Sequence, residues 1–307
     1  MSLLLLVLAI WVIASMKTSR FDGTLVQPLH PYRRLMAHIM DRKTEATVYF
    51  DSAIDAEPLL QYIEEASGQF RLDITHCCLG AGFIGLHRVP SMNRFVVGRR
   101  LYQRRHAEIS FSMKRKRMDR AAKIANLKTR VRPGETFRQL CERVQSEIQV
   151  ERTDVVTRED QEYGLLNRLP RPLLAFAIAA AKWLDYYNLA PRALIEPDAL
   201  YTSLYIGNLG SVGMAPGYHH LYEWGNCPIF IMVGAIEPRV VAGPDGQVAV
   251  KRMLPFRFSY DERIDDGLTA GQGIKAMLTA LERPYEYLGC LKPDGSDARR
   301  LDDPNPL

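Results

Sequence analysis

Charged residues directly after a strand-like run are the part of this sequence best placed for proton transfer. Phe256, Phe258 and Tyr260 alternate with polar residues, and D-E-R-I-D-D-G follows over residues 261–267. Glu262 could act as a general base if burial raises its pKa, because an unperturbed glutamate, with a pKa of about 4.3, is about four units too acidic to deprotonate a thiol. The alternative is that Glu262 forms an ion pair at a contact between subunits.

A loop between two glycines holds a second set of groups suited to proton transfer. Its sequence over residues 217–225 is G-Y-H-H-L-Y-E-W-G. A neutral imidazole with a pKa of about 6.5 is a suitable base, so His219 or His220 could take that role. Glu223 or Glu262 could orient the ring. The alternative is that the two histidines are surface or interface residues. Adjacent histidines point apart and no third ligand is evident, so we expect no metal site.

The segment at residues 259–267 resembles a motif of one enzyme family. Dihydrolipoamide acyltransferases, the core subunits of 2-oxo acid dehydrogenase complexes, carry S-Y-D-H-R-x-x-D-G in their catalytic domain, and this chain has S-Y-D-E-R-I-D-D-G. The chain also resembles chloramphenicol acetyltransferase, more distantly. Further elements that look like those of the family follow its order over roughly residues 30–290. They are Arg33 and Arg34, P-S-M-N-R at 90–94, R-L-Y at 100–102, I-S-F at 109–111, N-L-G at 208–210, and V-G-A-I at 233–236 with Pro238 and Val240.

The resemblance implies a fold, an assembly and a substrate class. The fold is an α/β two-layer sandwich of the chloramphenicol acetyltransferase type, in which a mixed sheet has helices on one side. The assembly is a homotrimer with the active site between subunits. The substrate is a coenzyme A or acyl-carrier thioester, whose acyl group passes to an acceptor, and no bound cofactor is implied.

The same resemblance assigns roles to individual residues. In the family the motif histidine is the base, and a hydroxyl just before N-L-G stabilises the oxyanion. Glu262 and Gly207 stand at these two positions, so both chemical groups of the family are replaced. Asp266 occupies the position of the structural aspartate, with Arg33 or Arg34 as its partner. The residues expected at the substrate site are Gly207, Asn208, Tyr222 and Glu223.

Two functions remain open from the sequence. One is a thioester-dependent acyltransferase, in which Glu262 and the loop at residues 217–225 act in altered roles. The other is a catalytically silent homologue that keeps the trimer as a scaffold or binding subunit. The replaced base and hydroxyl favour the silent homologue, whereas the polar loop favours the enzyme. Our interpretation leans to the acyltransferase.

Composition excludes several other classes of protein. The chain has 307 residues, a net charge of +5, 47% hydrophobic residues and 24% charged residues, values typical of a globular protein. Because the excess of positive charge is small and no aromatic stacking platform accompanies it, we expect no nucleic-acid partner. Five cysteines without a CxxC pair indicate neither a disulfide framework nor a zinc site, and we interpret Cys77 and Cys78 as reduced core residues.

The two ends of the chain differ from its body. Residues 1–16 are nearly all apolar, which indicates membrane contact through an anchor; the alternative is an upstream start codon, with translation beginning at Met16. About 16 helical residues span about 24 Å, less than the ~30 Å hydrocarbon core. Lys17 and the arginines after it would keep the body cytoplasmic, attached to the inner face of the membrane if the segment inserts. A catalytic-type domain at 17–290 and a polar, disordered tail at 291–307 complete the expected organisation.

The remaining pattern predicts alternating helices and strands. The predicted helices lie at residues 30–40, 58–66, 73–86, 137–148, 173–183 and 267–281, and the strands at 47–50, 108–113, 228–233 and 256–260. The helix at 173–183 is so apolar that we expect it to be buried on more than one side.

Two bursts of basic residues follow one another near the middle of the chain. Such bursts could attract the phosphates of a coenzyme A-type substrate or anionic lipid. The alternative is a solvated hairpin tip. The bursts are Arg99, Arg100, Arg104 and Arg105, and then residues 114–117.

Overall fold

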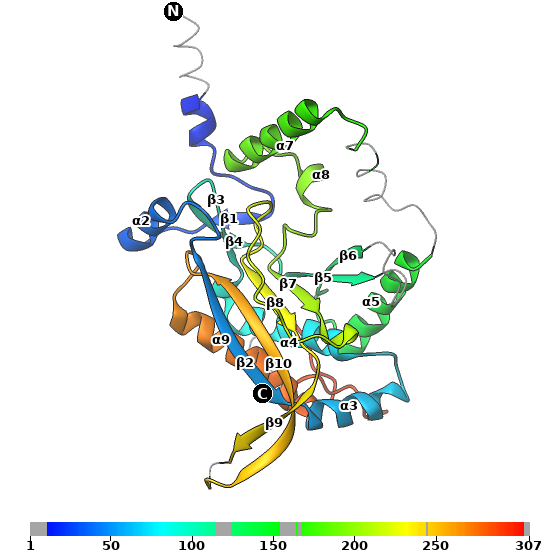
Figure 1. The fold of residues 1–307 in the computed structure, drawn as a ribbon. Coiled ribbons are helices and arrows are strands. Elements are labelled where there is room, and N and C mark those ends of the chain that lie inside the picture. The colour runs from blue at the N-terminus through cyan, green and yellow to red at the C-terminus, as the bar shows by residue number, and fades with distance from the viewer. Residues whose placement is uncertain (1–10, 115–123, 154–163, 165–166, 244, 304–307) are drawn as a thin grey trace, which may run out of the picture.

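A seven-stranded mixed sheet forms the centre of the molecule, and a small three-stranded sheet lies beside it (Figure 1). The computed structural model describes residues 11–114, 124–153, 164, 167–243 and 245–303. The strand order of the large sheet is β2-β10-β8-β7-β5-β6, with β9 paired to β10. The bounds are β2 (Thr47–Asp55), β5 (Glu108–Lys114), β6 (Ile124–Arg130), β7 (Leu204–Asn208), β8 (Ile229–Val233), β9 (Glu237–Ala242) and β10 (Val248–Asp261).

The central strands β5, β7 and β8 are parallel, and the remaining pairs are antiparallel. Successive side chains of a strand point to opposite faces, so each strand divides its residues between two environments. On β8, Ile229, Ile231 and Val233 join the main core, whereas Phe230 joins a smaller cluster on the other face. This arrangement explains the continuous apolar sequence of β8, which is buried along its whole length as predicted.

Helices cover one face of the large sheet (Figure 1). Two of them, α4 (Ile74–Arg88) and α9 (Gly267–Glu282), lie against each other, and α3 (Glu57–Ser67) and α5 (Phe137–Glu151) join the same core. Asp73 caps α4 by accepting a hydrogen bond from the N–H of His76, and Thr136 caps α5 in a capping box with Gln139. The prediction of a mixed sheet with helices on one side is confirmed.

The small sheet has the strand order β1-β4-β3 and lies near the N-terminal part of the chain. Its strands are β1 (Gly23–Leu25), β3 (Arg94–Val97) and β4 (Arg100–Arg104). Helix α2 (Pro31–Ile39) contacts β4. The shorter elements are α8 (Arg192–Ile195), α10 (Pro284–Tyr287) and two 3₁₀ turns, η1 (Pro90–Met92) and η2 (Gly210–Val212). In the described part of the chain, no helix has the length and apolar character needed to cross a membrane.

The apolar helix predicted at residues 173–183 is present as α7 (Arg171–Tyr186), but the prediction that it is buried on more than one side is wrong. Asp185 is its one buried residue. The large side chains of Leu173, Phe176 and Trp183 are exposed. The last turn of α7 is held to the body through Asp185, and the other residues of the helix are half-buried or exposed. The apolar sequence therefore identified a helix but not its partner.

The predicted disorder of the polar tail is also wrong for residues 291–303. Leu301 is fully buried, and Arg300 forms an isolated β-bridge with Thr136. Asp302 accepts a hydrogen bond from the N–H of Gly134 at 3.0 Å, and Asp297 accepts one from Leu291 at 2.8 Å. One apolar side chain and a few turn-forming aspartates are enough to fix this segment.

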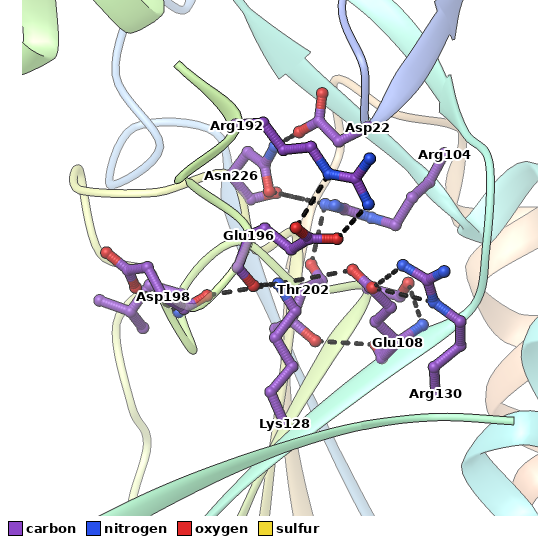
Figure 2. Close-up of polar contacts among 12 residues, drawn as sticks. Asp22, Arg104, Glu108, Lys128, Arg130, Arg192, Glu196, Asp198, Thr202 and Asn226 are labelled. Carbon is purple, nitrogen blue, oxygen red and sulfur yellow. Dashed lines mark hydrogen bonds and ion pairs between the residues drawn. The ribbon is translucent and has the colours of Figure 1, made fainter. Parts of the chain in front are cut away.

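The first basic burst is not a solvated hairpin tip throughout, because Arg104 lies inside the protein (Figure 2). Its guanidinium donates to Asn226 Oδ1 at 2.7 Å and to the Thr202 carbonyl at 3.0 Å, over the ring of Phe95. Asn226 in turn donates to Asp22 at 2.9 Å. Figure 2 also shows the neighbouring ion pairs of Glu108 with Lys128 and Arg130 and of Glu196 with Arg192. A buried and partnered Arg104 is not available to attract substrate phosphates.

All five cysteines are free and buried. Cys77 and Cys78 lie in α4, where burial raises the pKa of both thiols. Their prediction as reduced core residues is confirmed.

Candidate functional site

The motif loop, residues 261–267, is fixed by a buried ion pair at the end of β10. Asp261 and Arg263 make two hydrogen bonds of 2.8 Å, and both side chains are almost fully buried. Arg263 also donates to the carbonyl of Met40 at 3.0 Å. A buried carboxylate and guanidinium with their hydrogen bonds satisfied hold the loop in one shape.

Arg33 of α2 joins the same loop, as the sequence predicts, but its nearest carboxylate differs from the expected one. The distance from Nη2 is 3.2 Å to Asp265 Oδ1 and 3.7 Å to Asp266 Oδ2. Arg33 Nη1 also donates to the carbonyl of Glu262 at 3.1 Å, and Arg94 pairs with Asp265 at 3.3 Å. Arg33 therefore contacts three successive parts of the motif loop.

Asp266 has a second structural role, because it begins α9. Its side chain accepts a hydrogen bond from the N–H of Thr269 at 2.9 Å and caps the helix. This bond from the Thr269 N–H holds the pKa of Asp266 below its usual value. Asp265 was not expected as the partner of Arg33, since the family pattern leaves its position variable.

Glu262, the residue at the position of the family's histidine, is half-buried. Its main-chain N–H donates to Ala46 at 3.0 Å, and its carbonyl accepts from Arg33. Within the described residues its carboxylate makes no hydrogen bond or ion pair. Both earlier interpretations, a base and an ion pair at a subunit contact, stay predictions.

Gly207, at the position of the family's hydroxyl, is closely covered by Met232 on the neighbouring strand. The two residues are directly opposite in the β7–β8 pairing. A Cβ atom at position 207 would lie 2.8 Å from the sulfur of Met232, closer than side chains normally approach. The space that a serine hydroxymethyl group would need is thus filled by a thioether, which donates no hydrogen bond.

Asn208, expected at the substrate site, makes contacts within the protein. Its Nδ2 donates to Thr75 Oγ1 at 3.0 Å, and its Oδ1 accepts from the N–H of Ser211 at 3.0 Å. These bonds tie the end of β7 to α4 and to the 3₁₀ turn that follows. They describe a positioning role for this amide.

The His219 loop, residues 217–225, covers part of the sheet face that has no helices. The ring of His219 stacks on Phe230 with 4.7 Å between centroids, and its carbonyl accepts a hydrogen bond from Ser259 Oγ. His219 Nδ1 lies 2.7 Å from the carbonyl of His220. A carbonyl only accepts, so Nδ1 carries the proton and Nε2 has the lone pair. Partial burial lowers the pKa of His219, which keeps the imidazole neutral near pH 7.

The other members of this loop have different surroundings. His220 is exposed, and its ring stacks on that of His219 with 5.0 Å between centroids. Tyr222 is also exposed and meets both histidine rings edge-on. The Glu223 carboxylate accepts hydrogen bonds from the N–H of Thr44 at 3.1 Å and from its hydroxyl at 3.2 Å. Burial raises the pKa of Glu223, but these hydrogen bonds outweigh it and leave the value below normal.

The expected residues are only partly brought together. His219, His220 and Tyr222 form one ring cluster. Neither Glu223 nor Glu262 is hydrogen-bonded to a histidine in the described part of the chain. Phe230, on which His219 stacks, and Met232, which pairs with Gly207, are two residues apart on β8 and therefore point to the same face of the sheet. His219 thus lies one side-chain row from Gly207.

A cavity of about 240 Å³ is lined by the end of the His219 loop (residues 223–225), by Arg263 of the motif loop, by the turn between β3 and β4, and by the last turns of α7. Neither His219 nor Glu262 is among its lining residues. Lys43 is buried at its wall and donates to the carbonyl of Gly225 at 2.6 Å. Burial lowers the pKa of Lys43 to about 8. Lys43 was not predicted as a site residue, because a lysine just after a helix carries no signal in the sequence that it will be buried. The other charged residues at the wall are Asp41, Arg99, Lys182, Asp185, Glu223 and Arg263.

The side chains described above do not form a metal site. Among the described residues, no three histidine, cysteine, aspartate or glutamate side chains come together as metal ligands do.

Comparison with known proteins agrees with this geometry. Residues 180–289 match the family model described as 2-oxoacid dehydrogenases acyltransferase (catalytic domain). This range includes Gly207, the His219 loop and the motif loop. No curated protein matches the chain.

Solved structures share the fold at low sequence identity. One is a probable dihydrolipoamide acetyltransferase from Listeria monocytogenes 4b F2365, with a TM-score of 0.54 and 15% identity over 85% of this chain and 95% of that chain. The Azotobacter vinelandii dihydrolipoamide acetyltransferase has a TM-score of 0.53 and 14% identity over 89% of this chain and 94% of that chain. A chloramphenicol acetyltransferase has a TM-score of 0.51 and 11% identity over 84% of this chain and 99% of that chain. The predicted resemblance to the acyltransferase catalytic domain is confirmed, and so is the chloramphenicol acetyltransferase type of fold.

Proposed function

We propose that this protein is an acyltransferase that acts on a thioester of coenzyme A or of an acyl carrier, with His219 as its base. The observation that carries the proposal is the state of the His219 ring. Its Nδ1 is fixed on the His220 carbonyl at 2.7 Å, its pKa is lowered by burial, and its Nε2 lone pair is left to accept a proton. This is the tautomer that a general base requires.

In the proposed reaction His219 first accepts a proton and later returns it. Nε2 of His219 takes the proton of the acceptor thiol or hydroxyl, and the acceptor attacks the thioester carbonyl. A new bond to carbon forms, the carbon–sulfur bond breaks, and the departing thiolate takes the proton back from the imidazolium. The structure of Azotobacter vinelandii dihydrolipoamide acetyltransferase named above comes from a study of a serine, a histidine and an asparagine in its catalytic mechanism. In this chain Glu262 and Gly207 stand at the family's histidine and hydroxyl positions, so the proposed proton transfer lies on another loop.

A homotrimer with a site between subunits is part of the proposal. The β9–β10 hairpin extends from the body (Figure 1) and exposes Val240, Val248 and Val250. Helix α2 exposes Leu35 and Ile39. These surfaces support subunit contacts, and a neighbour at the motif loop would give the Glu262 carboxylate the partner that it lacks among the described residues. Asn208, Gly207, Tyr222 and Glu223 keep the proposed role of lining the substrate site.

Cellular placement is proposed from the sequence. We place the protein in the cytoplasm, with residues 1–16 as the contact to the inner face of the membrane.

A catalytically silent scaffold is the second candidate, and the contact of Met232 with Gly207 favours it. At this position the family's oxyanion donor is absent and its space is occupied. The ion pairs of the motif loop would serve a scaffold equally well, because they hold its shape rather than move protons.

The test measures thiol release from a panel of acyl-coenzyme A and acyl-pantetheine thioesters with thiol and hydroxyl acceptors. We expect turnover that falls at least ~100-fold in His219→Ala. His220→Ala is the matched control, because it removes an exposed ring that stacks on His219 but keeps the carbonyl that holds Nδ1, and it should stay within a few-fold of the wild type. Turnover no higher than that of the His219→Ala, Glu262→Gln double variant on every thioester would reject the enzyme and support the scaffold.

A further inference from the structure

Helix α7 carries an apolar surface that the described part of the chain leaves exposed. Phe176 is 73% exposed, Leu173 54% and Trp183 45%, although residues 173–181 contain no polar side chain. Soluble proteins rarely leave a continuous surface of this kind without a function. At 16 residues, α7 is about 24 Å long, so its shape suits a helix that lies along a surface rather than one that crosses a membrane.

The first described residues extend this surface. Residues 11–16 are helical, and Trp11, Ile13 and Met16 are exposed. Figure 1 shows this turn next to the C-terminal end of α7. Trp11 Nε1 donates to the hydroxyl of Tyr187 at 3.0 Å, which ties the two segments together. We call Trp11, Ile13, Met16, Leu173, Phe176 and Trp183 the apolar face.

The attachment of the apolar face to the body is well defined. Arg20 pairs with Asp185 at 2.9 Å, and Asn188 donates to the carbonyl of Lys17 at 2.8 Å. Arg100 donates to the carbonyl of Ser15. These bonds join residues 15–20 to the last turn of α7 and to the small sheet. The exposed side chains thus belong to a folded surface rather than to a loose end of the chain.

The two segments that carry the apolar face have charges of one sign, whereas two carboxylates that share a cavity wall with Lys182, those of Asp41 and Glu223, come from other segments. Residues 11–20 and 167–184 contain no aspartate or glutamate. Lys17, Arg168, Arg171 and Lys182 are exposed there and make no ion pair in the described part of the chain. Asp185, the acidic residue that follows, is buried and paired with Arg20.

We propose that the apolar face is a docking surface for anionic lipid membranes, on which α7 and residues 11–16 lie in the headgroup region. Aromatic side chains with cations beside them match the polar–apolar boundary of a bilayer. A second copy of this chain docked through the same face would bring the four cations against one another, whereas anionic headgroups neutralise them. The proposal goes beyond membrane contact through residues 1–16, because it assigns a contact to a folded helix over 150 residues further along the chain.

The experiment is co-sedimentation of the full chain with vesicles of phosphatidylcholine alone or with 30–40% phosphatidylglycerol, a composition range on the order of anionic cell membranes. We expect binding to the anionic vesicles, and a loss of about fivefold for Lys182→Gln. Phe176→Glu should weaken binding tenfold or more, because it places a charge in the headgroup–acyl boundary. Val150→Glu is the matched control: it adds the same charge at an exposed apolar position of α5 and should bind like the wild type.

A second measurement locates the contact without changing the charge. Brominated lipids quench only nearby indoles, so they should quench the fluorescence of Trp183. The Trp183→Phe variant, which lacks this emission, identifies it. Trp224, hydrogen-bonded to Asp198 at 2.6 Å, should remain unquenched.

Three results would overturn the proposal. The first is that Phe176→Glu binds vesicles as well as the wild type does. If Ile13→Glu abolishes binding in that case, the contact belongs to residues 11–16 and not to α7. The second is no binding to either vesicle. The third is a change in oligomeric state in Phe176→Glu without any change in vesicle binding, which would assign the apolar face to a protein contact. Circular dichroism should show both glutamate variants folded, since the replaced side chains are exposed.

Discussion

The motif loop and the His219 loop both contribute residues to the wall of one cavity, yet they are held in different ways. The motif loop depends on paired charges: Asp261 with Arg263, and Asp265 with Arg33 and Arg94. The His219 loop depends on ring stacking, on main-chain bonds and on one buried lysine without a carboxylate within ion-pair distance in the described chain. The difference teaches that a loop can keep its shape after its chemical group has changed, provided that the shape was set by other residues.

The largest effect is expected from removing one partner of the buried pair. Asp261→Ala leaves the Arg263 guanidinium buried with only the Met40 carbonyl as an acceptor, and should lower the free energy of unfolding by about 3–5 kcal/mol. Urea denaturation measures this loss. The double variant Asp261→Leu, Arg263→Met should be more stable than Asp261→Ala, because no unpaired charge stays buried. A double variant that is less stable than Asp261→Ala would contradict this account of the motif loop.

The second prediction concerns Lys43 and pH. Burial lowers the pKa of Lys43 to about 8 from 10.5, so between these values the unfolded chain binds more protons than the folded one. The free energy of unfolding contributed by Lys43 should therefore rise as the pH increases through that interval, by up to about 3 kcal/mol. The measurement is the difference between the wild type and Lys43→Met in urea denaturation from pH 7 to pH 10.

Taking that difference isolates Lys43 from other groups. Burial raises the pKa of Cys77, Cys78 and Cys141, which lowers stability at high pH equally in both proteins. Cys227 is the exception, because its thiol interacts with Lys43 and its contribution stays in the difference. Lys43→Arg is a further control, since its charge does not titrate in this range. If the difference in the free energy of unfolding does not change with pH, the pKa of Lys43 is the same in the folded and unfolded chain, and burial does not destabilise its charged form.

The smallest effect is expected at Glu223. Its carboxylate is exposed and accepts two hydrogen bonds from Thr44, and an amide oxygen can accept the same bonds. Glu223→Gln should therefore change the free energy of unfolding by less than about 1 kcal/mol. Thermal unfolding near pH 7 checks this value. A loss above about 2 kcal/mol would mean that charge fixes both loops, and the contrast between them would disappear.

The sequence predicted the elements of the fold because their signals are local. Alternation in β10 and 3.6-residue periodicity in α4, α5 and α9 match the structure within a few residues, with β10 extending further toward its N-terminus than predicted. Burial was predicted less well. An apolar helix such as α7 has the same periodicity whether its partner is the core or lies outside the chain, so sequence could not show that Phe176 is exposed.

The candidate site was predicted only where a motif fixes the residue. Arg33 was correctly expected to meet the motif loop, but its closer contact with Asp265 depends on the angle at which α2 approaches. Lys43 and Met232 were not expected, because each contacts a residue distant in the chain. Lys43 donates a hydrogen bond to Gly225, and Met232 lies close against Gly207. Such pairings depend on register and loop path, which a single sequence does not encode in any short pattern.

Strand β10 has a consequence for how the parts of the molecule influence one another. Its first residues pair with β9 in the projecting hairpin, its later residues form the middle of the large sheet, and its last residue is Asp261. The hairpin and the motif loop are thus two ends of one continuous backbone segment without an intervening turn. A displacement of the hairpin on association would therefore act on the same strand that carries the motif loop and Glu262 at its other end.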